Sequence, residues 1–314
     1  MRVWTDRTEL AMGKMMAMGM VGLGLVAFGC GGSYDSAWDE EEQTADTSGG
    51  SDGAAAGSER TTLIEQGDAA WAERDDAARI QAAITAWEQA VEMDGSDHET
   101  WVKISRAYYF LADGHQRFDN PDAMADTYQS GIRAAERALR ALSPDFAQRM
   151  SAGEAMEEAA AVLEADAVPA LYWRATNLGK WARADGFATL LSFKDEIRAV
   201  MTRCLELDRS YFFTGPDRYF GAFYAIAPSY AGGDLERSQQ HFEYSISQQP
   251  NYFGTHVLMA ENLAVKLQNR EMFVEHLQLV IDGDPTALVG AEPENRVEQR
   301  KATELMTRVD DLFE

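Results

Sequence analysis

The chain is most informative about its fold at Leu235-Glu-Arg-Ser-Gln-Gln-His-Phe-Glu-Tyr-Ser-Ile-Ser-Gln-Gln-Pro250. Small residues at Ser238 and Ser245 flank Phe242 at intervals of four and three, and Pro250 follows five residues later. This spacing places two small side chains and one aromatic ring on the same face of a helix. A small residue lets a second helix approach closely, and the ring fills the gap beside it. The stretch therefore predicts a helix that packs tightly against a partner helix.

Related patterns occur elsewhere along the chain. A small residue or valine, followed by an apolar residue near the end of a predicted helix, is found at Ala90-Val91, Cys204-Leu205, Ser245-Ile246 and Val280-Ile281. The intervals of the first stretch recur at Ala83, Trp87, Ala90 and Gly95. Gly67 and Gly221 precede the two copies at intervals longer than those of a standard repeat. The pattern thus indicates repeated helix pairs that are divergent and have enlarged loops.

The rest of the chain is also helical in character. All eight prolines lie beyond residue 120, at breaks in an apolar pattern of period 3.6, and no stretch alternates with period two. We predict an all-α fold of divergent tetratricopeptide-like helical repeats, an α-solenoid, over residues 61–314. In this interpretation Cys204 is a buried small residue rather than a nucleophile. Gly232 and Gly233 form a turn, and Asp234 caps the helix that begins at Leu235.

The N-terminus has the features of a bacterial lipoprotein signal. Arg2, Arg7 and Lys14 precede fifteen uncharged residues that end at Gly29-Cys30, a run too short for a comfortable membrane helix. We predict a signal peptide over 1–29, lipidation of Cys30 and an acidic, Gly- and Ser-rich tether over 30–60. A plain secretory signal or a short anchor with an incidental cysteine is the alternative. Gly31 after the cysteine favours the outer membrane over the inner one.

Composition excludes several classes of function. With 52 acidic and 28 basic residues the chain carries a formal charge of −24, which disfavours nucleic acid as a partner. Two cysteines and five histidines offer no Cys-rich module, and Glu275-His276 or His241 with Glu243 lack the spacing to share a metal ion. Nucleophile elbows, phosphate loops and dinucleotide fingerprints are absent from the sequence. We therefore expect no catalysis, no metal and no cofactor.

Aromatic residues provide the candidate site. Trp173, Asn177 and Trp181 recur at i, i+4 and i+8, and Tyr219 and Phe223 pair at i and i+4. Faces of this kind could line a groove for an apolar ligand or a partner, with Asn177 orienting a carboxyl or amide group without a formal charge. Packing between adjacent helix pairs is the alternative for each residue.

The second half of the chain resembles a known family. The residues that carry the likeness are Pro169-Ala-Leu-Tyr-Trp173, Gly179-Lys-Trp181, Gly215-Pro216, Tyr219-Phe-Gly221, Tyr224, Pro228, Gly232-Gly-Asp234, His241-Phe-Glu243, Asp284-Pro285, Asn295, Arg300-Lys-Ala302, Leu305 and Asp311-Leu-Phe313. In order and spacing they resemble the TatT family, the T component of tetratricopeptide-associated TRAP transporters. The likeness covers about residues 60–314 and is strongest from 169 onward.

This resemblance implies a function in transport. It implies a periplasm-facing lipoprotein with a cleft or pore, association with a TRAP-type periplasmic solute receptor, a hydrophobic small ligand, a homotrimer and no catalysis. We therefore expect the accessory T component of a TRAP-type system. A repeat scaffold for outer-membrane protein assembly would share the signal, tether and solenoid but bind peptide segments. An enzyme with an unrecognised carboxylate site is the third possibility, supported only by the abundance of acidic residues.

Overall fold

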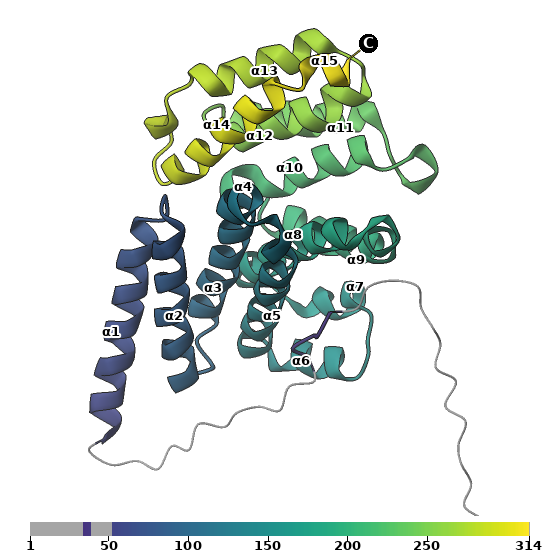
Figure 1. Ribbon diagram of the computed structural model, residues 1–314. Coiled ribbons are helices and arrows are strands. Elements are labelled where there is room, and N and C mark those ends of the chain that lie inside the picture. Colours follow the sequence, from purple (N-terminus) through teal and green to yellow (C-terminus); the bar gives the residue numbers. More distant parts are fainter. Residues whose placement is uncertain (1–33, 39–51, 314) are drawn as a thin grey trace, which may run out of the picture. The chain divides into compact units, whose positions relative to one another are not determined.

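The computed structural model describes residues 34–38 and 52–313, and every regular element in them is helical. The first half contains α1 (Asp52–Ala72), α2 (Ala77–Met93), α3 (His98–Phe110), the π-helix η1 (Leu111–Gln116), α4 (Arg117–Asp119), α5 (Met124–Leu142), α6 (Pro144–Ser151), α7 (Met156–Ala159) and α8 (Val168–Asp185). The second contains α9 (Phe187–Leu207), α10 (Tyr211–Ile226), α11 (Leu235–Gln248), α12 (Phe253–Leu258), the π-helix η6 (Met259–Ala264), α13 (Arg270–Asp282), α14 (Glu292–Met306) and α15 (Val309–Leu312). Helices that follow one another in the chain lie beside one another, as α1 and α2 or α8 and α9 do (Figure 1).

The small residues of the sequence pattern lie where two helices touch. A Cβ atom added to Gly221 on α10 would come within 2.7 Å of the Phe242 ring on α11, and one at Gly67 within 2.3 Å of the Trp87 ring. The Ser238 hydroxyl donates a hydrogen bond of 2.6 Å to the Gly221 carbonyl. Because nothing larger fits, the predicted close approach is confirmed for these two pairs.

Four helices end with the same kind of hydrogen bond at their C-terminus. At each, the N–H of the capping residue bonds to the carbonyl of a fully buried residue near the C-terminus, namely Ala90, Cys204, Ser245 or Val280. These are the residues that the recurring sequence pattern singled out. Burial also raises the pKa of the Cys204 thiol, as expected for a packing residue rather than a nucleophile. The Asp234 carboxylate accepts from two N–H groups at the start of α11, so the predicted cap is confirmed.

The structure describes two parts of the range 30–60, which we predict to be a tether. Helix α1 begins at Asp52, inside the range 30–60, where an Ala-rich stretch favours helix. The segment 34–38 packs on the helices: Ala37 and Trp38 are buried, and the Tyr34 hydroxyl donates to Glu136 on α5 at 2.8 Å. Two large aromatic side chains make this contact favourable. Cys30 and the predicted signal peptide lie outside the described residues.

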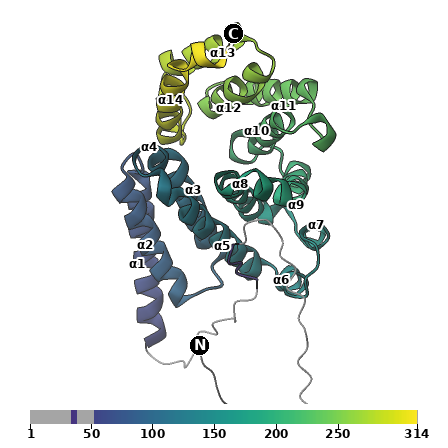
Figure 2. The same cartoon turned by 45° about the vertical axis from the view of Figure 1, so that its right-hand side comes forward.

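The C-terminal helix α14 returns to the N-terminal helices. Glu294 on α14 bonds to Arg74 at 2.9 Å and to Arg106 at 2.7 Å. Nearly two turns further along α14, Lys301 bonds to Asp113 on η1 at 2.5 Å. Figure 2 shows α14 next to the η1–α4 corner. Two buried ion-pair clusters therefore join chain segments that are about as far apart in sequence as the helical region allows.

Candidate functional site

A cavity of about 600 Å³ lies among α3, α8, α9, α10, η6 and α14. Its walls are rich in aromatic side chains, which are Tyr109, Phe110, Tyr128, Tyr172, Trp173, Phe187, Phe212, Tyr219, Phe223 and Tyr252. Both π-helices face it, through Asp113 on η1 and Asn262 on η6. Such bulges in a helix are frequent at functional sites. The size and lining suit a small ligand with an apolar body.

Three of the five predicted site residues line this cavity, and two do not. Trp173, Tyr219 and Phe223 contribute to the wall, and the rings of the last two stack at 5.9 Å. Asn177 and Trp181 are buried in packing elsewhere. Trp173 and Trp181 lie on different sides of α8, because eight residues of an α-helix turn about 80° beyond two full turns.

Asn177 and Trp181 are held by neighbouring helices. The Asn177 amide donates to the Trp173 carbonyl at 2.9 Å, and a Cβ on Gly131 of α5 would come within 2.5 Å of its Oδ1 atom. The Trp181 ring meets Tyr34 at 5.5 Å and Phe193 at 5.7 Å between centroids. For these two residues packing, the alternative interpretation, is what the structure shows.

The cavity is more positive than the protein as a whole. Seven Lys or Arg side chains and four acidic ones line it, although the chain carries a formal charge of −24. Asp113 bridges Lys180 and Lys301, each at 2.5 Å. Burial raises the pKa of Asp113, but the two ammonium groups outweigh it, so that this pKa lies well below its usual value. The expectation that a ligand would be recognised without formal charge therefore does not fit the lining.

Arg218 is the most unusual cation in the wall. Its side chain is only 4% exposed, yet no carboxylate of residues 34–38 or 52–313 forms an ion pair with it. Its guanidinium donates to the Phe213 carbonyl and, at 2.7 Å, to the Phe212 carbonyl, and lies 4.2 Å from the centre of the Tyr252 ring. Arginine cannot give up its proton at neutral pH, so this buried charge stays in place without an anion beside it.

The backbone that Arg218 holds is strained. Phe212, Phe213 and Thr214 all have left-handed backbone angles, with φ of 44°, 56° and 60°. Each such residue costs about 1–2 kcal/mol. The turn places Phe212 in the cavity wall, 4.7 Å from the Trp173 ring, and aims two carbonyls at Arg218. Strain of this kind accumulates at ligand sites.

Sequence reasoning missed Arg218 and Asp113. One signal was available for Arg218, since it is the only cation in Tyr211-Phe-Phe-Thr-Gly-Pro-Asp-Arg-Tyr-Phe-Gly-Ala-Phe-Tyr224. An arginine that is the only cation in such an aromatic stretch is expected to lie among aromatic rings. Asp113 gave no local signal, because its partners come 67 and 188 residues later.

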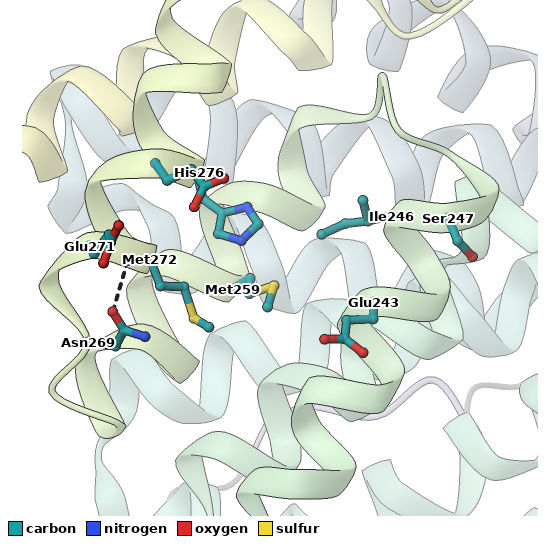
Figure 3. Close-up of a pocket in the computed structure, with 9 residues that line it drawn as sticks. Glu243, Ile246, Ser247, Met259, Asn269, Glu271, Met272 and His276 are labelled. Carbon is teal, nitrogen blue, oxygen red and sulfur yellow. Dashed lines mark hydrogen bonds between the residues drawn. The ribbon is translucent and has the colours of Figure 1, made fainter.

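A second pocket, of about 470 Å³, is shown in Figure 3. Met259 from η6, Met272 and His276 from α13 and Glu243 from α11 line it, and Asn269 caps α13 by accepting from the Met272 N–H. The Nδ1 atoms of His276 and His256 lie 2.9 Å apart. Burial, and then the neighbouring His276, lowers the pKa of His256 to about 4, and burial lowers the pKa of His276.

No helix in the part of the chain that the structure describes has the length and apolar character needed to cross a membrane. Within the same residues, no three His, Cys, Asp or Glu side chains come together in a way that could hold a metal ion.

Comparison with known proteins gives one match. The family model of the TRAP transporter T-component matches residues 115–313, which is more than half of the chain and includes most of the cavity wall. A search of curated proteins found no match.

Proposed function

The chain belongs to the TRAP transporter T-component family, as its resemblance predicted, and from this premise we propose that its cavity binds an amphipathic anion for a TRAP-type transport system. The family is a group of transport accessories and not a class of enzymes, and membership fits a membrane-associated role. In this proposal Arg218 meets the anionic group of the ligand, and the aromatic wall receives its apolar body.

The single observation that carries the proposal is the buried charge of Arg218, with which no carboxylate of the described residues forms an ion pair. A buried guanidinium without an anion is costly, and carbonyl oxygens relieve only part of that cost. A carboxylate, sulfonate or phosphate on the ligand would complete the site with charge-assisted hydrogen bonds, each contributing about 1.5–3 kcal/mol. The other cavity cations already have carboxylate partners or lie nearer to solvent, as Lys180, Lys301 and Arg183 do.

The aromatic wall supplies the remaining affinity. At about 25 cal/mol per Å² of apolar surface, contact with two or three rings contributes several kcal/mol before the costs of association. Trp173, Tyr219 and Phe223 are the rings that both the sequence pattern and the cavity lining support.

We further propose how the protein is placed in the system. Lipidation of Cys30 would hold it on a membrane, facing the periplasm and on the outer membrane side, where a TRAP-type solute receptor would dock and exchange ligand. The helix pairs would follow one another as divergent tetratricopeptide-like repeats, and the assembly would be a homotrimer. The close contacts at Gly67 and Gly221 support the repeat interpretation.

Binding of an amphipathic fluorescent probe tests the function. Titrating the protein with 11-(dansylamino)undecanoic acid should give energy transfer from its tryptophans, of which Trp173 lines the cavity, and Tyr219→Ala should weaken binding at least tenfold. Tyr230→Ala is the matched control, because Tyr230 is 83% exposed and lies outside the cavity wall. Equal affinities for both variants and the wild type would place the ligand elsewhere.

A further inference from the structure

Two soft thioether sulfurs and one imidazole ring line the second pocket. In Figure 3 the thioethers of Met259 and Met272 and the imidazole of His276 point toward one another, from π-helix η6 and from α13. Met259 is 3% exposed, and the other two are half-buried. The His276 ring has one hydrogen bond, through Nδ1, and its Nε2 atom has no partner among the described residues. This free nitrogen lies on the side of the ring that faces the two sulfur atoms.

A chain of hydrogen bonds fixes which nitrogen of His276 carries the proton. The Nε2 atom of His256 lies 3.2 Å from the Pro250 carbonyl, which can only accept, so that nitrogen must be protonated. In the neutral imidazole the Nδ1 atom of His256 is then an acceptor, and His276 must donate to it from its own Nδ1. The lone pair of His276 is therefore left on Nε2, toward the pocket. An outer partner that orients a ligating histidine in this way is typical of metal sites.

The donor set selects the kind of ion. Thioether sulfur binds soft cations such as Cu(I) and is a poor ligand for zinc, calcium or magnesium. Hard and borderline ions lack a site here, because no three His, Cys, Asp or Glu side chains of residues 34–38 and 52–313 come together. Glu243, Glu271 and Glu275 line the same pocket and make it attractive to a cation without supplying soft ligands.

We propose that Met259, Met272 and the Nε2 atom of His276 form a binding site for one soft monovalent cation, Cu(I) or its analogue Ag(I). His256 is a positioning residue, since it acts only through the ring of His276. The site shares no lining residue with the cavity that contains Arg218, and the proposal does not depend on the proposed transport function.

Silver stoichiometry tests the site on the intact protein. We expect native mass spectrometry of the full chain in detergent, loaded with silver nitrate, to show one more retained ion for the wild type than for Met259→Leu/Met272→Leu. Leucine replaces methionine with little change in volume, so both proteins should fold. His276→Gln should likewise lose one ion, and silver should raise the melting temperature of the wild type but of neither variant.

Matched controls make the outcome decisive. Met156→Leu changes an equally buried methionine outside the pocket and should keep the wild-type silver count. Any ions bound elsewhere, for example at Cys30, are common to all variants and cancel in the difference. Zinc should give no ion that depends on Met259 and Met272. Equal silver counts in the wild type and the double variant, with unchanged melting shifts, would overturn the proposal.

Discussion

A buried arginine lies on each of two sides of α8, and the two differ in whether carboxylates pair with them. On the side that packs against α5, Arg174 is 1% exposed and bonds to Glu136 at 3.0 Å and to Glu196 at 2.6 Å. On the cavity side, Arg218 from α10 is 4% exposed, with carbonyls and rings around it, and no carboxylate of the described residues pairs with it. The difference separates a charge that the fold itself neutralises from a charge that a ligand can neutralise.

Arg174→Met should have the largest effect on stability. It leaves Glu136, which is fully buried, without its cation, and breaking a buried pair costs about 3–5 kcal/mol. Urea unfolding should show this loss in the free energy of unfolding. Adding Glu136→Gln to the same protein should recover part of it, because the orphaned charge is then removed. If Arg174→Met is no more destabilising than an exposed substitution, the ion pairs of Arg174 do not stabilise the fold, and the proposed difference between the two arginines is wrong.

Trp181→Ala should cost a similar amount of stability and leave ligand binding intact. The ring is buried against Tyr34 and Phe193, away from the cavity, and truncating a buried tryptophan costs about 3–5 kcal/mol. Probe affinity, measured well below the variant's melting temperature, should match the wild type. Loss of affinity in a folded Trp181→Ala protein would show that the packed side of α8 also contributes to binding.

His256 is buried like the two arginines, but unlike arginine a histidine can lose its proton and become neutral. Its pKa is lowered to about 4 in the folded protein, against about 6.5 when unfolded. Its contribution to stability is therefore complete above about pH 6.5 and is lost as the pH falls toward 4, by at most about 3 kcal/mol. Denaturant unfolding over this range should be steeper in pH for the wild type than for His256→Gln. Parallel curves would show that His256 does not titrate differently on unfolding.

Local patterns in the sequence predicted the local parts of the fold. Ser238, Phe242 and Ser245 were placed correctly because helical spacing alone decides which residues share a short face. Helical spacing is less informative over the eight residues from Trp173 to Trp181, because the helix turns the second ring to another side. It also gave no sign that Trp38 would pack on the helices.

The charged part of the cavity could not be predicted, because its partners are distant in sequence. Asp113 and Lys301 meet across 188 positions, and only the return of α14 brings them together. Whether a carboxylate lies beside Arg218 likewise depends on all the side chains that the fold brings around it. The sequence could therefore predict a site rich in aromatic residues, but the charges that line it could be identified only from the folded structure.

The most direct test is whether Arg218 recognises the charge of the ligand. The measurement compares 11-(dansylamino)undecanoic acid with its uncharged methyl ester, on the wild type and on Arg218→Met, with Arg218→Lys as the variant that keeps the charge. Arg183→Met, which removes an exposed cation from the rim, is the control. We predict that the wild type prefers the acid at least tenfold, or about 1.4 kcal/mol, that Arg218→Met loses this preference but still binds the ester, and that Arg183→Met keeps it. An unchanged preference in a folded Arg218→Met protein would contradict the account.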